Sequence, residues 1–367
     1  MSDRILVLGG SGRIGNCVAA DIAAHTGAEI TLTSRDRNFQ PPDDRYLVQY
    51  CDINQTDRLP ELIANYNLVI HCAGPFLHRD ARVLGTCIEC GVNYLDVSDS
   101  PEFTQKALAY HPFAIEAGVT AIINSGIFPG ISNSMVRQGV EQLDGEIDRI
   151  HLSYVVSGSG GAGITVLRTT FLGLQKPLNA WIEGQWRSIQ PYSDREMVEF
   201  PAPYNRVGVY WFDVPETLTL AESFPVQTVV TKFGSVPDFY NYLTWAIARF
   251  APSRWLENPQ LVEFLSRVSY GMTQFTDKFT GIGVAICARA EGKKEGKLAQ
   301  YSSRLVLENT AIAAGAGTGS IAELMLSGQL NQPGVSPVER VLPTSLFEWA
   351  MQSRGINIES EWLRVED

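Results

Sequence analysis

The stretch that decides the fold is ILVLGGSGRIG at residues 5–15, which is followed by a helical pattern from Cys17 to Ala23. An apolar strand here runs into a glycine turn and then into a helix. Glycines let the backbone turn tightly and approach a pyrophosphate, and the amides at the start of the helix attract its negative charge. The stretch therefore predicts a dinucleotide-binding turn.

The glycines of this turn fit two known spacings. Gly10, Gly12 and Gly15 give G-x-G-x-x-G, whereas Gly9, Gly12 and Gly15 give the spacing of extended short-chain reductases. An ordinary glycine turn in another α/β protein is the alternative, but the apolar strand before the turn and a second strand after it make that alternative weaker. Cofactor contacts are expected from the following residues: Gly9, Gly10, Ser11, Gly12, Arg13 and Ile14.

The end of the second strand indicates which cofactor binds. Residues 29–33 form this strand, and Ser34 and Arg35 follow it. NAD enzymes usually place an acidic residue here to bind the ribose hydroxyls, whereas a hydroxyl and a guanidinium suit the 2′-phosphate of NADP. Arg13 can point to the same place, so we expect NADP. NAD remains an alternative, since either Asp36 or Asp43 could accept a hydrogen bond from the ribose hydroxyls.

Further parallel strands are predicted at residues 46–51, 67–72, 93–97 and 119–123. The carboxyl ends of such strands carry the ligand site in open α/β sheets. We expect the cofactor to be flanked there by Asp52, Ile53, Ala73, Gly74, Pro75 and Phe76. Candidates for proton transfer are Tyr94 and Asp96. The alternative is that Tyr94 packs in the core and Asp96 caps a loop.

A series of motifs is similar to the saccharopine dehydrogenase-like reductases. It consists of the glycine turn, AGPF at residues 73–76, CIECGVNYLD at 87–96 and FPGISN at 128–133, and a tail with GQL at 328–330 and PGVSPVE at 333–339. The resemblance implies an oxidoreductase that transfers a hydride from or to NADP(H). Short-chain reductases are excluded, because no lysine has the tyrosine four residues earlier that their proton transfer needs.

The pattern changes near Ile150 to the alternation of a mixed or antiparallel sheet. The predicted fold class is α/β: a Rossmann-type doubly wound parallel sheet plus a second α+β domain. We expect residues 1–130, completed by about 310–367, to form the NADP-binding domain, and residues 131–309 to form an aromatic-rich substrate domain. Glycines within residues 157–163 indicate either an anion site or a hairpin loop, and those at 315–319 a closely packed helix.

The composition of the chain argues against several classes of binding partner. The net charge of −11 argues against nucleic acid and against a general affinity for anionic lipid. No apolar run is long enough to span a bilayer, and the early core strand leaves no room for a leader, so we expect a cytoplasmic protein. The scattered cysteines predict reduced thiols, and the histidines lack metal-ligand spacing.

The substrate is expected to be a small molecule other than saccharopine. Aromatic residues are dense between Trp181 and Phe279, which favours a large, apolar acceptor. Assembly into a homodimer is an alternative that the sequence does not decide. The competing interpretation is a non-catalytic protein that uses its NADP domain as a sensor or scaffold.

Overall fold

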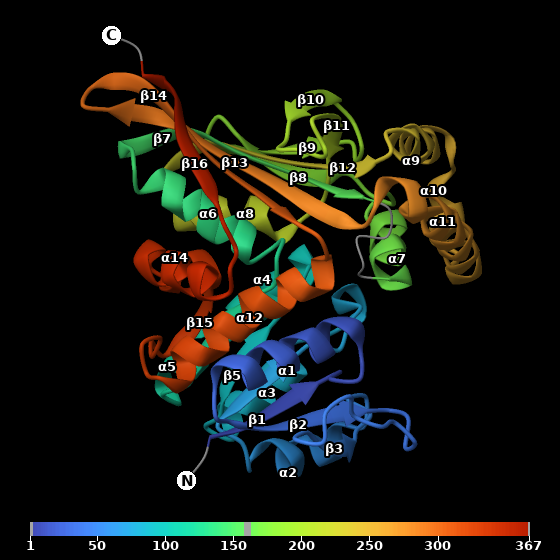
Figure 1. Ribbon diagram of the computed structural model, residues 1–367, viewed down its shortest axis with the longest axis vertical. Coiled ribbons are helices and arrows are strands. Elements are labelled where there is room, and N and C mark those ends of the chain that lie inside the picture. The colour runs from blue at the N-terminus through green and yellow to red at the C-terminus, as the bar shows by residue number, and fades with distance from the viewer. Residues whose placement is uncertain (1–2, 158–162, 366–367) are drawn as a thin grey trace. The chain divides into compact units, whose positions relative to one another are not determined.

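The computed structural model describes residues 3–157 and 163–365, and it divides the chain into two compact units. Unit 1 comprises residues 1–134 and 311–355, and unit 2 comprises residues 135–310 and 356–367. Both units are therefore built from two separate segments of the chain. Figure 1 shows the elements of each unit by label and by colour along the sequence.

Unit 1 contains a parallel sheet with the strand order β15-β6-β5-β4-β1-β2-β3 within the described residues. Its strands are β1 (Arg4–Leu8), β2 (Glu29–Ser34), β3 (Leu47–Tyr50), β4 (Leu68–His71), β5 (Asn93–Asp96), β6 (Thr120–Ile123) and β15 (Gly334–Pro337). The chain order reverses between β1 and β4. In a doubly wound sheet, this reversal opens the crevice in which ligands bind.

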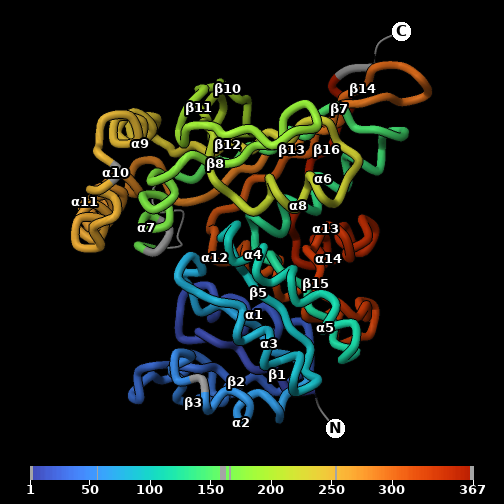
Figure 2. The backbone as a smooth tube through the Cα atoms, turned by 180° about the vertical axis from the view of Figure 1, so that it is seen from behind, coloured from blue at the N-terminus to red at the C-terminus, as the bar shows by residue number. Residues whose placement is uncertain are grey.

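Helices cover both faces of this sheet. They are α1 (Arg13–His25), α2 (Leu59–Ile63), α3 (Arg82–Glu89), α4 (Pro101–Leu108), α5 (His111–Glu116), α12 (Thr310–Leu326), α13 (Val338–Val341) and α14 (Thr344–Ser353). Side chains of α2 to α5 pack with those of the strands in one apolar core. Figure 1 looks onto the side of α1 and α12, and Figure 2 looks from behind onto α3, α4 and α5.

The glycines of α12 pack closely against their neighbours, as predicted. A Cβ added at Gly315 would lie 2.7 Å from the carbonyl oxygen of Cys17 in α1, and one at Gly317 would collide with the carbonyl oxygen of Gly126. The second glycine series is therefore a packing surface of a helix.

Unit 2 is built on a mixed sheet with the order β10-β11-β12-β7-β13-β14-β16, to which β8 and β9 add a hairpin. Its strands are β7 (Asp144–Ser157), β8 (Leu178–Ile182), β9 (Gln185–Ile189), β10 (Glu196–Glu199), β11 (Arg206–Trp211), β12 (Val226–Val236), β13 (Gly283–Lys294), β14 (Lys297–Leu307) and β16 (Glu359–Val365). The central strand β7 pairs in parallel with β12 and antiparallel with β13. The predicted fold class, with its second mixed sheet, is confirmed.

The helices of unit 2 are α6 (Ile131–Val140), α7 (Ile164–Leu172), α8 (Pro215–Ser223), α9 (Phe239–Phe250), α10 (Ser253–Leu256) and α11 (Pro259–Thr280). Helix α6 begins in the last residues of unit 1. Figures 1 and 2 both show α7 and α9 to α11 gathered at one end of the sheet. Helix α11 packs against α7, and Arg168 of α7 donates to the carboxylate of Glu263.

Two boundaries differ from those expected. Residues 356–367 belong to unit 2, because β16 pairs antiparallel with β14, whereas the sequence placed the whole tail in the first domain. The strand predicted from Thr280 begins at Gly283, since α11 continues to Thr280 and Gly281 ends it with a positive φ of 70°. The glycine run predicted as an anion site or a loop lies mostly at residues 158–162, outside the described residues.

Candidate functional site

The glycine turn follows β1 at the carboxyl edge of the parallel sheet. Gly9 has a positive φ of 77°, and a Cβ there would lie 2.9 Å from the Cα of Ala73. The turn is closed by a hydrogen bond from the Gly12 amide to the Gly9 carbonyl, at 2.9 Å. Gly15 is buried, and a Cβ on it would collide with the same carbonyl. The turn therefore depends on glycine at these positions.

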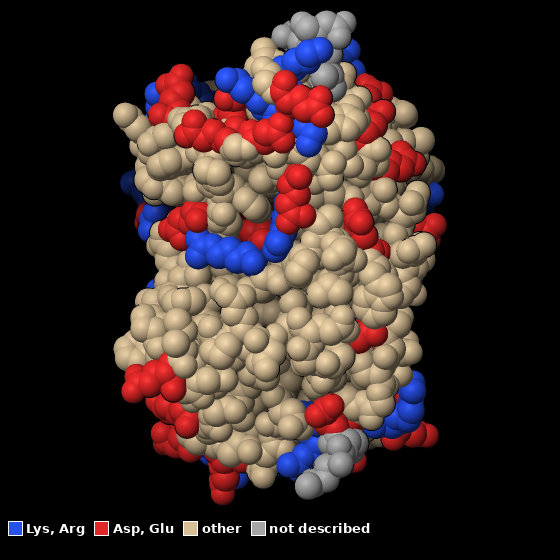
Figure 3. Space-filling view, turned by 90° about the vertical axis from the view of Figure 1, so that its left-hand side faces the viewer, with Lys and Arg blue, Asp and Glu red and all other residues tan. Residues whose placement is uncertain are grey.

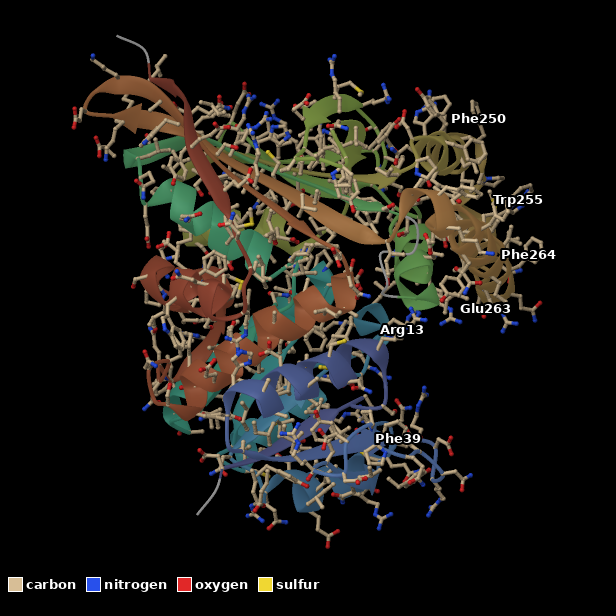
Figure 4. All side chains as sticks on the ribbon, viewed as in Figure 1. Arg13, Phe39, Phe250, Trp255, Glu263 and Phe264 are labelled. Carbon is tan, nitrogen blue, oxygen red and sulfur yellow. The ribbon has the colours of Figure 1, made fainter. Side chains whose placement is uncertain are left out.

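Helix α1 starts directly from this turn. Its N-cap is Gly12, which has no capping side chain. The amides of the first turn therefore point out of the helix toward the space above the turn, where they can hold an anion. Ser11, Gly12 and Arg13 are exposed there, and Figure 4 labels Arg13 at the start of α1.

The two residues predicted to select the cofactor differ in accessibility. The Ser34 side chain is buried, and its hydroxyl accepts from the Asp36 amide at 3.0 Å. Arg35 is exposed directly after β2. Of the two acidic alternatives, Asp36 accepts from the Asn38 amide, and Asp43 forms an ion pair of 2.7 Å with Arg45.

More guanidinium groups gather at this edge than the sequence spacing suggested. Burial lowers the pKa of Arg79, and the nearby charge of Arg35 lowers it further, against the opposing charges of Asp52 and Asp80. The guanidinium carbon of Arg37 lies 4.1 Å from the centre of the Tyr50 ring. Arg35, Arg37 and Arg79 therefore place positive charge near the ends of β2 and β3, and Arg13 is exposed at the start of α1. Sequence reasoning missed Arg37 and Arg79, because no motif connects them to the turn.

Arg79 also connects the loops that follow β3 and β4. Its Nη1 donates to Oδ1 of Asn54 at 2.9 Å, and its Nε donates to the Ala73 carbonyl at 3.1 Å. Asn54 in turn donates to the carboxylate of Asp52. A pocket of about 180 Å³ beside β3 and α2 has Asp52 in its lining. The predicted residue Ile53 lies in the same loop and is partly buried.

The residues after β4 divide into accessible backbone and buried side chain. Gly74 is exposed, and Ala73 and Pro75 are half-buried. The ring of Phe76 is buried and packs against His71 and Phe103, with ring centres 4.9 and 5.0 Å apart. Any contact of Phe76 with a cofactor would therefore come from its backbone.

Tyr94 and Asp96 are fully buried. The Tyr94 hydroxyl lies 3.1 Å from Nδ1 of His71, and burial raises the pKa of this phenol well above its usual range. Burial also raises the pKa of Asp96 to about 6, although its Oδ1 accepts from the amides of Ser98 and Asn124. Their predicted role in proton transfer stays a prediction.

Asp99 is a further candidate that sequence reasoning missed. It lies in the loop between β5 and α4 and is half-buried, whereas Asp96 is enclosed. Burial raises the pKa of Asp99 to about 6 as well. No sequence motif includes Asp99. The only sequence signal for it is its position shortly after Asp96, where the strand ends.

The loop after β6 is fixed by the tail of the chain. The amide of Gly130 and the hydroxyl of Ser132 both donate to Oδ1 of Asn133. Nδ2 of Asn133 donates to the buried carboxylate of Glu339, at 3.0 Å. The motif at residues 128–133 and the motif at 333–339 therefore form one buried polar contact within unit 1.

Two absences concern the described residues. No three His, Cys, Asp or Glu side chains among them are grouped so that they could hold a metal ion. No helix in the described ranges is long and apolar enough to cross a membrane.

On the face of the molecule shown in Figure 3, acidic side chains are scattered, and most basic side chains lie beside acidic ones.

Comparison with known proteins supports the motif series. Residues 5–122 match the family model of the saccharopine dehydrogenase NADP binding domain. A carboxynorspermidine synthase of Vibrio cholerae is 23% identical over 95% of this chain and 94% of its own length. A human saccharopine dehydrogenase-like oxidoreductase is 28% identical over 32% of this chain and 27% of its own.

Among solved structures, saccharopine dehydrogenase (L-Glu forming) from Saccharomyces cerevisiae is similar with a TM-score of 0.67 and 12% identity, over 99% of this chain and 100% of that one. This likeness extends the shared fold to both units. The predicted resemblance is confirmed: residues 5–122 match the saccharopine dehydrogenase NADP binding domain, and the chain is similar in sequence to saccharopine dehydrogenase-like oxidoreductases and in fold to saccharopine dehydrogenase.

Proposed function

We propose that this protein is an oxidoreductase that uses NADP(H) in preference to NAD(H). The observation that carries the proposal is the group of guanidinium ions at the end of β2, beside a glycine turn that opens into a helix. A 2′-phosphate would neutralise the repulsion between Arg35 and Arg79, which adds to burial in lowering the pKa of Arg79. The ribose hydroxyls of NAD carry no charge, so they would not neutralise this repulsion.

Each part of the cofactor has residues suited to it. The amides at the start of α1 would bind the pyrophosphate, and Asp52 and Ile53 would flank the adenine. The accessible backbone of Ala73, Gly74 and Pro75 would border the nicotinamide. The bound cofactor supplies or accepts the hydride, so the chain itself has to hold the acceptor, exclude water and move a proton.

For the proton we favour a carboxyl group at the end of β5. A general acid works best with a pKa near the operating pH. Burial raises the pKa values of Asp96 and Asp99 to about 6, and Asp99 as a residue is the less buried of the two, in the loop after β5. Tyr94 suits this role less, because its phenol is enclosed and its pKa is raised. We therefore assign proton transfer to Asp99 and a supporting position to Tyr94 and Asp96.

For the substrate we propose a small molecule with a C=N or C=O group, other than saccharopine. A dicarboxylic amino acid would favour several free arginines that converge on it. In unit 2, four arginines instead form ion pairs with carboxylates of the same unit: Arg168, Arg187, Arg195 and Arg267. Imines, enones and ketones are therefore the acceptors to test.

The test is the fall in NADPH absorbance when the full-length protein is mixed with imines, enones and ketones. We expect turnover with at least one acceptor and its loss in Asp99→Asn, while NADPH binding is retained. Glu102→Gln, on the exposed side of α4 close by, is the matched control. Tight NADPH binding without turnover of any acceptor would instead support a non-catalytic protein that uses its NADP domain as a sensor or scaffold. Turnover at the wild-type rate in Asp99→Asn would reject the assigned acid.

A further inference from the structure

Helix α11 of unit 2 exposes large apolar side chains and buries small polar ones, which is the reverse of a helix that faces water. Its buried residues are Val262, Ser266 and Thr273, and two of these three are small and polar. Phe264, Phe275 and Phe279 are instead 61%, 65% and 77% exposed. At 100° per residue, these three and Val268 lie within an arc of about 60°, opposite the buried residues. The exposed stripe therefore needs an apolar partner.

The same inversion occurs in α9. Asn241 is fully buried, and its side chain donates to the carbonyls of Gly208 and Ser235. Phe239, Leu243 and Phe250 are exposed on the opposite side of this helix. Figure 4 shows Phe250, Trp255 and Phe264 on the outer side of α9 to α11, pointing away from the sheet of unit 2.

We call these exposed apolar side chains the aromatic face. Its members are Phe239, Tyr242, Leu243, Trp245, Phe250, Trp255, Phe264, Val268, Phe275, Phe279 and Ile282. Exposed apolar areas of this extent mark interaction sites with proteins or membranes. The mixture of phenylalanine with tryptophan and tyrosine is typical of chains that lie at the boundary between lipid headgroups and acyl chains.

Charge distinguishes between the two kinds of partner. The chain carries −11 overall, yet residues 239–282 contain four basic residues (Arg249, Arg254, Arg267 and Lys278) and three acidic ones (Glu257, Glu263 and Asp277). Glu263 is bound by two arginines, Arg168 and Arg267, and these neighbours lower its pKa to about 2. The four basic residues are exposed, whereas Glu257 is the one acid in this segment with an exposed side chain.

A second copy of the chain is the less suitable occupant. A two-fold contact places the same surface on both sides, so the exposed basic residues of one copy would face a surface whose exposed charges are also mainly basic. An anionic lipid surface would pair with them, while the acidic remainder of the protein would be repelled and would turn this face toward the lipid.

We propose that the aromatic face of α9, α10 and α11 binds peripherally to a membrane surface that contains anionic lipid. The helices would lie in the plane of the headgroups with their phenylalanines at the acyl boundary, and no segment would cross the bilayer. The whole-chain charge argues against a general attraction to anionic lipid; the proposed attraction is local to this face. The proposal is independent of the cofactor that unit 1 binds.

The experiment is flotation of the full-length protein with vesicles of phosphatidylcholine, with and without phosphatidylglycerol. Wild type should float with both and more with the anionic vesicles. Phe264→Ser and Phe275→Ser should each weaken partition about tenfold, since each removes one ring that binding would bury in the lipid. Phe113→Ser replaces a similarly exposed phenylalanine in unit 1 and should change nothing. The double variant Arg254→Glu/Lys278→Glu should lose only the gain from phosphatidylglycerol.

Folding and self-association are measured on the same samples. The unfolding temperature and the NADPH affinity of each variant should equal those of wild type; a variant that unfolds early is replaced by Phe279→Ser. Absence of wild-type protein from the floated fraction would overturn the proposal, as would equal flotation of Phe264→Ser and Phe275→Ser. A dimer in light scattering that these substitutions convert to a monomer, with no change in flotation, would assign the face to a second copy instead.

Discussion

Replacement of Arg35 by alanine should change which cofactor the protein prefers. Arg35 is exposed directly after β2, near the charge of Arg79. A charge-assisted hydrogen bond contributes about 1.5 to 3 kcal/mol. Because Arg35 is exposed and solvent screens its charge, we take the lower end, which corresponds to about tenfold. NADPH should therefore bind about tenfold more weakly, and NADH should bind as it does to wild type.

Calorimetric titration of both cofactors into wild type and Arg35→Ala measures this change directly. Arg82→Ala is the matched control, since Arg82 is an exposed arginine at the start of α3 that pairs with Asp80. The difference between the two cofactors should also shrink as salt is added, because exposed charges are screened. An equal loss for NADPH and NADH, or a wild type that prefers NADH, would refute the assignment of Arg35 to the 2′-phosphate.

Three further substitutions test other parts of the structure. Gly15→Ala places a methyl group against the Gly9 carbonyl and should weaken NADPH and NADH binding alike, whereas Gly27→Ala, which has no neighbour within 4 Å, should leave both titrations unchanged. Gly317→Ala in α12 should lower the free energy of unfolding in urea by about 1 to 3 kcal/mol, and Gly271→Ala, in open space, should not; equal stability would contradict the packing role of α12. Asp96→Asn should remove a pH dependence: the folded pKa of about 6 lies above the ordinary 3.8, so the stability that Asp96 contributes is complete below about pH 4 and is lost as the pH rises through 6. Relative to wild type, Asp96→Asn should therefore gain up to about 3 kcal/mol between pH 4 and pH 7.5, and a constant difference over that range would show that Asp96 is not perturbed.

The parallel sheet could be predicted because its signals are local. Each strand of unit 1 is a short apolar run followed by turn residues, and the glycine turn fixes the order of strand, turn and helix. The sequence did not indicate that β16 returns to the sheet of unit 2, since that pairing joins Glu359–Val365 to Lys297–Leu307 across a whole helical segment. Pairings of this kind depend on tertiary contacts, which leave no periodic pattern in the strand itself.

The candidate site was predictable where a motif sets the backbone and not where side chains converge. The turn at residues 9–15 follows from its glycines. Arg79, by contrast, reaches Asn54 and Ala73 from a loop that no spacing rule connects to them. Burial also could not be read from position: Phe76 and Tyr94 both lie at the ligand edge of the sheet, yet their rings face the core.

The most direct test of the central claim follows the hydride itself. Full-length protein is mixed with NADPH that carries deuterium at both C4 positions and with the acceptor found by absorbance, and the masses of the products are measured by mass spectrometry. The account predicts one deuterium in each reduced acceptor, an equal amount of NADP⁺, and transfer from deuterated NADH that is at least about tenfold slower at equal subsaturating concentrations. Transfer from NADH at the same rate, or NADPH bound with no deuterium leaving it, would contradict the account.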